Sequence, residues 1–391
     1  MTYTVDASKA MGKEFVVFED IYRDNNLVVS HADINDEGQT VKVVTPQVHT
    51  TATSDEGDKQ VMPEQDVTIK DAVAYSNLVV GKHYSVTGYL HYTDGSFVLD
   101  AKGNKISKTV AFTAEKTTGT IDVTFTVDGR LLAGKDVVVF ENLYHNDNLM
   151  AFHEDVNDKD QTVTFPKIEL HTTATDSEGS KEVVPEEKVT VKDAVAYHDL
   201  IVGKTYTVTG YLHYTDGSFV KNADGSKVSK TVTFKAEKAD GTIDVEFVVD
   251  GRALAGKDVV AFEYLYHNNK LIASHEDIND KDQTVHFPKI ELHTTATSDG
   301  KKTVTASRNM IINDVVEFND LVIGKTYTVK GYLMDKTTGK PVLINGKKVT
   351  AEKTFKATAK DMKVTMTFTF DGSSLGGHDV VAFEDLYHDG K

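Results

Sequence analysis

Residues 137–145 read VVVFENLYH, and this stretch decides the fold because it occurs four times along the chain. It returns as VVAFEYLYH at 259–267, as VVAFEDLYH at 380–388 and, in a looser form, as FVVFEDIYR at 15–23. Polar and apolar residues alternate in it, and it is rich in Val, Phe and Tyr, which is typical of a half-buried β-strand. The sequence therefore predicts repeats that are built from strands.

Other strings give the length of the repeat. VHTTATSDEG at 48–57 returns as LHTTATDSEG at 170–179, and LHTTATSDG begins at 292. The spacing is 122 residues for the threonines of these strings and for two further sets of residues: His31, His153 and His275; Gln39, Gln161 and Gln283. A fixed period of this size indicates tandem domains.

The period predicts two complete repeats, at 46–167 and 168–289. Residues 1–45 are interpreted as the C-terminal part of a preceding repeat, and 290–391 as an incomplete repeat that lacks its last strands. The simpler explanation is that the chain is a window from a longer array. Alternatively, the open C-terminal repeat accepts the N-terminal strand of a neighbouring chain. Both ends carry their own copy of the same strand, which argues against this second explanation.

Within a repeat the pattern is β throughout. KHYSVTGYLHY and TIDVTFTVDG alternate like VVVFENLYH, and turn signals such as TDGS, AKGN, VDGR and HNDN separate the strands. No stretch has a convincing helical period. The fold class is therefore predicted to be all-β: tandem immunoglobulin-like antiparallel β-sandwich repeats. The short Pro-containing linkers VTPQ and FPKI favour their arrangement as a rod.

Composition excludes several classes of partner and chemistry. The net charge of -17 over 391 residues argues against nucleic acid or an anionic membrane as a partner. No apolar run approaches the roughly 20 residues of a membrane span. Cysteine is absent, so disulfides, thiolate metal sites and Cys nucleophiles are excluded.

Five polar residues of each complete repeat lie in phase with apolar neighbours on predicted strands. Unpaired burial of polar groups is costly, so these side chains are expected to meet in the core. A single one could face solvent, but five in register in both repeats favour burial. They are Thr50, Asp71, Glu141, His153 and Gln161 in the first repeat, and Thr172, Asp193, Glu263, His275 and Gln283 in the second.

These residue types together could form a covalent bond within the chain. A His can take the proton of a Thr hydroxyl and make it a nucleophile. Two adjacent carboxyls cannot both ionise, so one can stay protonated and stabilise the oxyanion formed when Thr attacks the Gln carboxamide. Ammonia would leave and an ester would remain. Because the electrophile belongs to the chain, this predicts single-turnover self-crosslinking and no enzyme, cofactor or metal.

The strings HTTAT, KDAVAY, VAFE and H-x-D-x-x-D-x-x-Q-T resemble the Thr–Gln ester-bond (VaFE-type) repeat domains of Gram-positive cell-surface adhesins, over essentially the whole chain. The resemblance implies esters between Thr50 and Gln161 and between Thr172 and Gln283. It also implies that a His, an Asp and a Glu promote each bond: His153, Asp71 and Glu141; His275, Asp193 and Glu263. The part-repeats keep the crosslink candidates Glu19, His31 and Gln39 at one end and Thr294, Asp314 and Glu384 at the other. Thr294 and Asp314 are one residue closer than their counterparts, which predicts a shorter loop.

The predicted function is a structural stalk segment of a bacterial surface adhesin or fibre, which places the chain outside the cell. Its expected partners are neighbouring repeats of the same chain and, through the incomplete terminal repeats, a neighbouring chain. Attachment to the cell wall and its peptidoglycan is implied by the resemblance only.

Calcium is the strongest alternative, since DVNDKD at 155–160 and DINDKD at 277–282 resemble oxygen-rich calcium loops. Such repeats would be calcium-stabilised and would bind a host ligand. However, the loops lack the Gly of an EF-hand turn, and DINDEG at 33–38 has lost an acid, so solvated acidic turns also fit. A Thr–His–Asp hydrolase, a ligand-binding array and Lys–Asn isopeptide crosslinks are weaker alternatives. The histidines beside the threonines are expected on the surface: His49, His171 and His293.

Overall fold

The computed structural model describes residues 1–390, apart from the side chain of Ser8. It divides into two compact units, one of residues 1–168 with the loop 199–201, the other of the remaining described residues. Strands account for nearly all regular structure, and the helical elements among the described residues are short 3-10 turns. None of the helices described is long and apolar enough to cross a membrane.

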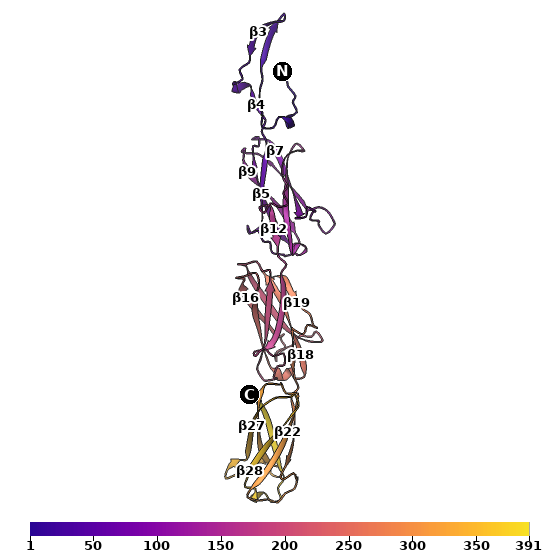
Figure 1. Ribbon diagram of the computed structural model, residues 1–391, viewed down its shortest axis with the longest axis vertical. Coiled ribbons are helices and arrows are strands. Elements are labelled where there is room, and N and C mark those ends of the chain that lie inside the picture. Colours follow the sequence, from indigo (N-terminus) through magenta and orange to yellow (C-terminus); the bar gives the residue numbers. More distant parts are fainter. Residues whose placement is uncertain (391) are drawn as a thin grey trace. The chain divides into compact units, whose positions relative to one another are not determined.

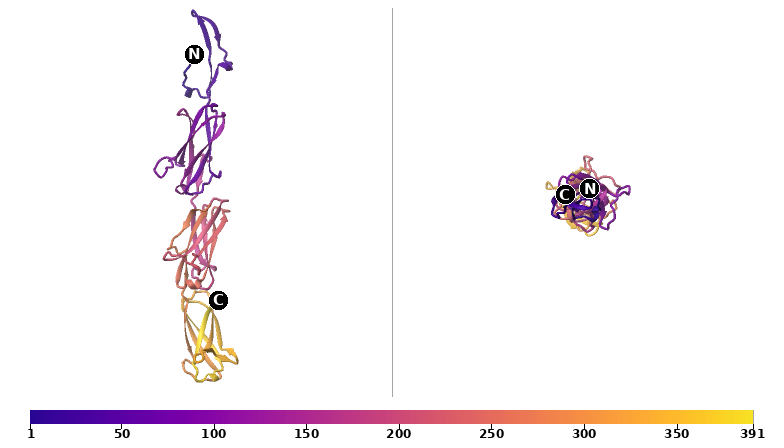
Figure 2. Two further views of the ribbon diagram at one scale, coloured as in Figure 1. Left: turned by 180° about the vertical axis from the view of Figure 1, so that it is seen from behind. Right: turned by 90° about the horizontal axis from the view of Figure 1, so that it is seen from above.

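The first complete repeat is a two-sheet sandwich (Figures 1 and 2). Strand β6 lies between β5 and β9 in one sheet, while β7 and β10 form the centre of the other, with β8 and β11 outside them and β12 paired to β10. Every pairing is antiparallel. The elements are β5 (Gln47–Ser54), β6 (Val67–Ser76), β7 (His83–Tyr92), β8 (Ser107–Thr113), β9 (Gly119–Val127), η3 (Gly129–Leu132), β10 (Lys135–His145), β11 (Asn148–His153) and β12 (Thr162–Phe165).

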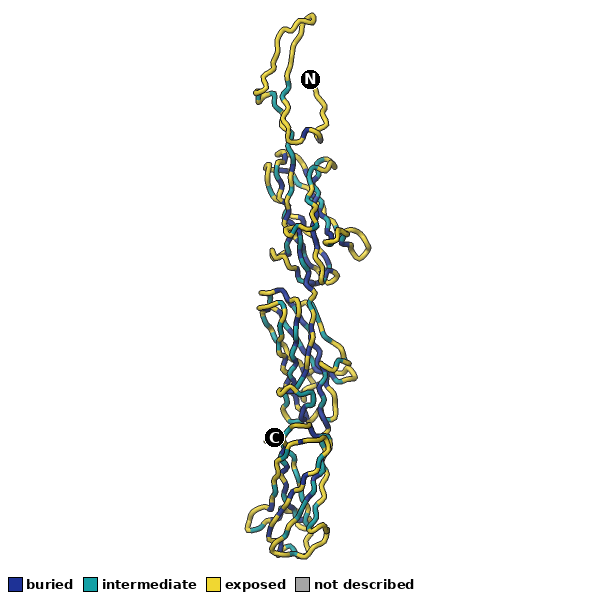
Figure 3. The backbone as a smooth tube through the Cα atoms, in the orientation of Figure 1, coloured by how far each residue is buried: buried dark blue, intermediate teal, exposed yellow. Residues whose placement is uncertain are grey.

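The core of this sandwich follows from the alternation of the strands. Val67, Ile69 and Val73 of β6 face Val86 and other apolar residues of the opposite sheet, and all are buried. The intervening residues of β6 are more exposed. Figure 3 shows buried positions concentrated along the strands of each sandwich. Period-two patterning therefore decides which side chains reach the interior.

The second complete repeat has the same topology. Its sheets are β13–β14–β17 and β16–β15–β18–β19, with β20 paired to β18. The elements are β13 (Glu169–Asp176), β14 (Val189–His198), β15 (Thr205–Tyr214), β16 (Ser229–Lys235), β17 (Gly241–Val249), η4 (Gly251–Leu254), β18 (Lys257–His267), β19 (Lys270–His275) and β20 (Thr284–Phe287).

The C-terminal repeat keeps both sheets, and its second sheet has four strands instead of five. β21–β22–β28 form one sheet, and β23 pairs with β24, β27 and β29 in the other. Ala296 still pairs with Asp314, as Ala52 pairs with Asp71, so the one-residue difference is absorbed in the connecting loop as predicted. The elements are β21 (Glu291–Thr297), β22 (Met310–Asn319), β23 (Thr326–Asp335), β24 (Lys340–Pro341), β25 (Leu343–Ile344), β26 (Lys347–Lys348), β27 (Thr350–Lys356), β28 (Met362–Phe370), η5 (Ser373–Leu375) and β29 (Val380–His388).

Residues 1–45 form two small antiparallel pairs, β1 with β4 and β2 with β3. Apolar side chains on the β2–β3 hairpin are exposed, among them Ile21 at 61% and Leu27 at 55%. The elements are η1 (Ala7–Lys9), β1 (Glu14–Val16), β2 (Glu19–Arg23), β3 (Asn26–His31), η2 (Glu37–Gln39) and β4 (Thr40–Lys42). The sandwiches that follow this segment confirm the predicted class of tandem antiparallel β-sandwich repeats.

Candidate functional site

Four polar side chains are fully buried in the core of the first complete repeat. Thr50 on β5, Asp71 on β6, Glu141 on β10 and Gln161 just before β12 are each 0% exposed. The fifth predicted residue, His153 at the end of β11, has a side chain that is 21% exposed. Strands from both sheets therefore bring an interior polar cluster together, with the His at its surface edge.

Strand register explains why these residues meet. Asp71 lies opposite Ala52 across the β5–β6 pair, two residues along β5 from Thr50. Glu141 lies directly opposite His153 across the β10–β11 hairpin. This hairpin closes through Asn146 and Asp147, whose φ values of +49° and +63° suit a tight two-residue turn. Turn chemistry thus fixes the alignment of the Glu with the His.

The Gln161 amide is held firmly by its neighbours. Its Nε2 donates to the backbone oxygens of Val139 at 2.7 Å and His153 at 3.0 Å, and to Glu141 Oε2 at 3.2 Å. Its Oε1 accepts from the backbone N–H of Asp155 at 3.3 Å. Because backbone oxygens only accept, they settle which end of the amide is the nitrogen. Glu141 therefore lies on the nitrogen side of the carboxamide, away from the oxygen that would become the oxyanion.

The groups around Thr50 are unusual for a protein core. Thr50 Oγ1, both Asp71 carboxyl oxygens and Glu141 Oε1 are buried and have no hydrogen-bond partner among the described residues. Buried polar atoms of this kind are rare and call for an explanation. The Thr50 hydroxyl therefore lies beside two carboxyl groups without a hydrogen bond of standard geometry.

Electrostatics separates the roles of the two carboxyl groups. Burial, with the neighbouring Asp71 adding to it, raises the pKa of Glu141 well above its usual value. Burial also raises the pKa of Asp71, but interactions with Glu141, Thr50 and His153 act in the opposite direction. Two like charges that interact in a core are mutually unfavourable. Glu141 is therefore the more readily protonated of the two carboxyl groups.

His153 has two different sides. Its Nε2 is 3.2 Å from Asp158 Oδ2, while its Nδ1 is buried and lacks a hydrogen-bond partner within residues 1–390. A carboxylate on Nε2 favours the tautomer with hydrogen on that nitrogen, which leaves Nδ1 as a base. Asp158 was not predicted as a site residue, although it belongs to the H-x-D-x-x-D motif. His275 with Asp280, at 3.3 Å, and His31 with Asp36, at 2.9 Å, repeat the pair.

The second complete repeat reproduces this geometry. Gln283 Nε2 donates to the backbone oxygen of Ala261 at 2.7 Å, to that of His275 at 3.1 Å and to Glu263 Oε2 at 3.4 Å. Burial and Asp193 raise the pKa of Glu263 well above its usual value. Thr172 Oγ1 and both Asp193 oxygens are also buried without partners among the residues described. All five predicted residues therefore lie together in this repeat as well.

The part-repeats hold their residues in more open surroundings. In the N-terminal segment Glu19 lies opposite His31, and both are exposed, while Gln39 is half-buried. In the C-terminal repeat Thr294 is exposed and Asp314 is 0% exposed. Burial and Asp314 raise the pKa of Glu384 to about 8.

Besides Asp158, two supporting residues of the site were not predicted from the sequence. Lys59 Nζ donates to the backbone oxygens of Ala52 and Asp160, each at 2.6 Å, and so joins β5 to the loop before Gln161. Gly88 lies opposite Glu141, and a Cβ there would come within 2.8 Å of Phe125 Cζ. The need for Gly88 becomes visible only in the packing between the two sheets. Lys59 could not be singled out in the sequence because Lys is common on protein surfaces.

The acidic loops use their carboxylates internally. Asp155 Oδ1 accepts from the Asn157 N–H at 2.9 Å, and Asp158 Oδ1 accepts from the Asp160 N–H at 2.8 Å. These are local turn hydrogen bonds of the kind that Asp forms in loops. They favour the interpretation as solvated turns over a calcium loop.

Comparison with known families identifies the domain type. The model of the T-Q ester bond containing domain matches residues 1–43, 46–165, 168–287 and 290–391. The chain therefore belongs to the family of T-Q ester bond containing domains, as its motifs predicted. No curated protein matches the chain.

Similar solved structures include two of a bacterial adhesin from Mobiluncus mulieris that contains intramolecular disulfide, isopeptide and ester bond cross-links. One is 16% identical and covers 65% of this chain and 87% of its own, with a TM-score of 0.30. The other is 13% identical and covers 88% of this chain and 100% of its own, with a TM-score of 0.29. The C-terminal domain of the Streptococcus agalactiae AgI/II polypeptide BspA is 11% identical, covers 59% of this chain and 100% of its own, and has a TM-score of 0.31.

Proposed function

We propose that the chain is a stalk segment of a bacterial surface adhesin or fibre whose complete repeats, 46–167 and 168–289, are each stapled by an autocatalytic Thr–Gln ester. One observation carries the proposal. In both repeats a buried Thr hydroxyl without a partner lies in the same core cluster as a Gln carboxamide and a raised-pKa Glu. Membership of the T-Q ester bond family supports it. The extracellular location and attachment to peptidoglycan belong to the same proposal.

The placement of the groups supports the following reaction in the first repeat. Thr50 gives its hydroxyl proton to His153 Nδ1, and Oγ1 attacks the carboxamide carbon of Gln161. The backbone N–H of Asp155, 3.3 Å from Oε1 in the resting amide, stabilises the charge that develops on that oxygen.

Collapse of this intermediate releases ammonia. The Glu141 proton passes to Nε2, which already lies 3.2 Å from Glu141 Oε2, and the carbon–nitrogen bond breaks. The proton on His153 then restores the carboxyl pair. One ester bond forms, one amide bond breaks and one ammonia leaves, so the residues act once and the chain is no enzyme. Burial among apolar side chains protects the ester from water.

The bond would have a mechanical effect because of where it lies. It would join β5, the first strand of the repeat, to Gln161, which directly precedes β12, the last strand. Tension applied to the two ends of the repeat would pass through the ester and bypass the sandwich. In single-molecule stretching, the wild-type repeat should release no chain length between the two linked residues, whereas Thr50→Val should release it.

The intact mass of the denatured chain tests the proposal. A deficit of two ammonia molecules is expected, and Thr50→Ala or Gln161→Ala should restore one of them. A mass equal to that of the plain sequence would overturn the proposal. A larger deficit, or covalent oligomers, would mean that Gln39 and Thr294 of the part-repeats react between chains as well.

A further inference from the structure

The outer side of His153 lies beside another imidazole. His49 precedes Thr50 on β5, so alternation turns it outward while Thr50 turns inward. Its ring centroid is 5.0 Å from that of His153, with an angle of 42° between the planes. Asp158 approaches the same His153 ring at 3.2 Å. One ligand atom from each of the three side chains lies within 4.8 Å of the other two.

We infer that His49, His153 and Asp158 form a binding site for a divalent transition metal such as Zn²⁺. Two imidazoles and a carboxylate suit Zn²⁺ and its neighbours, whereas Ca²⁺ prefers oxygen ligands only. Metal bonds of about 2.0–2.2 Å require the three atoms to come closer than they now lie. His49 is exposed and can make this movement by a side-chain rotation.

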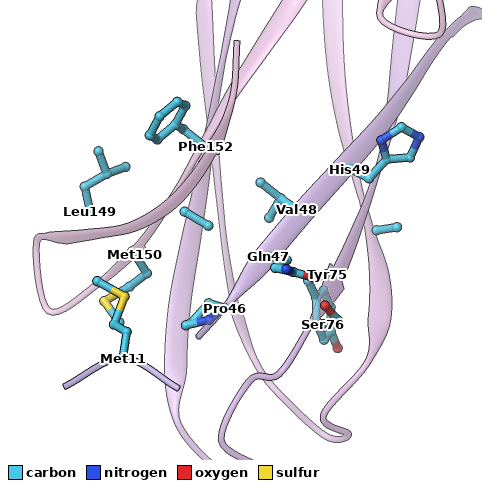
Figure 4. Close-up of a pocket in the computed structure, with 12 residues that line it drawn as sticks. Met11, Pro46, Gln47, Val48, His49, Tyr75, Ser76, Leu149, Met150 and Phe152 are labelled. Atoms are coloured by element: carbon cyan, nitrogen blue, oxygen red, sulfur yellow. The ribbon is translucent and has the colours of Figure 1, made fainter. Parts of the chain in front are cut away.

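Access to the site is open. The His153 and Asp158 side chains are each 21% exposed. His49 also lines a pocket of 660 Å³, and Figure 4 shows it at the end of the pocket away from Met11 and Pro46. A hydrated ion can therefore reach the three side chains, and water can complete its coordination, as in zinc sites with three protein ligands.

The second complete repeat supplies a matched comparison. His275 and Asp280 repeat the close pair, at 3.3 Å. His171, the counterpart of His49, has its ring centroid 5.9 Å from those of both His275 and His198. The position of His198 is occupied by Ser76 in the first repeat, so the imidazole that lies near His171 has no counterpart at that position beside His49. The inference therefore concerns the first repeat.

Titration calorimetry with Zn²⁺ on the tag-free, chelator-treated full chain tests the site. We expect one bound ion in the first repeat, and binding weakened by more than about tenfold in both His49→Ala and Asp158→Asn. His171→Ala should bind as the wild type does. An absence of Zn²⁺ binding, or unchanged binding by His49→Ala, would overturn the inference. His49 is exposed, so its variant is expected to fold, and circular dichroism checks this.

A further variant separates the metal site from the proposed ester. Thr50→Ala removes the nucleophile but none of the three ligands, so it should bind Zn²⁺ like the wild type. If Thr50→Ala lost both the ammonia deficit and the metal, the site would depend on the crosslink, and the inference that these three side chains suffice to bind Zn²⁺ would be wrong. If Zn²⁺ bound while the mass showed no ester, the metal site would stand without the proposed function.

Discussion

Replacing Thr50 with Val removes the proposed nucleophile with almost no change in shape. The hydroxyl makes no hydrogen bond of standard geometry within the described chain, although its proximity acts against the burial that raises the pKa of Asp71 and of Glu141, so its loss affects mainly these two carboxyl groups. The surroundings are apolar residues of the core together with the two carboxyl groups. The substitution therefore reports on the crosslink and hardly on packing.

The expected loss of stability follows from the size of the closed loop. Gln161 follows Thr50 by 111 residues, so the ester would enclose nearly the whole repeat. The chain-entropy model gives a crosslink of this span about 5 kcal/mol. A repeat of 122 residues unfolds with an entropy of about 0.25 kcal/mol/K. The melting temperature of the first repeat should therefore fall by roughly 20 °C.

Differential scanning calorimetry of the full chain measures this shift. Thr50→Val should lower one transition, and Thr172→Val should lower the transition of the second repeat. Thr50→Ser keeps a nucleophile and is the matched control, with both the melting temperature and the mass deficit retained. If Thr50→Val regained one ammonia in mass but melted within a few degrees of the wild type, the reasoning on stability would be refuted.

Three further predictions concern groups around the sites. Because the pKa of Glu384 is raised to about 8 in the folded state, its carboxyl binds more protons in the folded than in the unfolded chain. The C-terminal repeat should therefore lose stability as the pH rises from about 4.5 to 8. Melting curves recorded across this pH range measure the loss, and Glu384→Gln should flatten it. Gly88→Ala should destabilise the first repeat by about 1–3 kcal/mol in denaturant unfolding, because the added Cβ would crowd Phe125. An unchanged denaturant concentration at the midpoint of unfolding would contradict this. Lys59→Met should lower the free energy of unfolding of the first repeat by about 1.5–3 kcal/mol, because it removes a charged hydrogen bond to the backbone oxygen of Ala52. The measurement is made in the Thr50→Val background, with Lys70→Met as a surface control. An equal loss in the control would contradict the prediction.

The fold and the membership of the buried cluster could be predicted because strands have a period of two. Once KDAVAY and VVVFENLYH are assigned as strands, the alternation assigns Asp71 and Glu141 to the same faces as their apolar neighbours. The 122-residue repeat shows the pattern twice in full and so strengthens the interpretation.

Details that depend on loops and on packing between sheets could not be predicted. The side of the carboxamide that Glu141 contacts depends on where the backbone oxygens of Val139 and His153 lie. The pairing of His153 with Asp158 depends on the conformation of an acidic turn, which the motif leaves open. The proximity of His49 to His153 arises because β5 lies beside β11, a contact between strands far apart in sequence.

Peptide mapping of the digested wild-type chain by tandem mass spectrometry tests the central claim most directly. The proposed chemistry predicts a branched peptide in which the segment holding Thr50 is joined to the segment holding Gln161 with the loss of one ammonia, and an equivalent peptide joining Thr172 to Gln283. Mild alkali should separate each into its two linear parts, as expected of an ester. Recovery of only linear peptides, with intact Gln161 and Gln283, would contradict the claim.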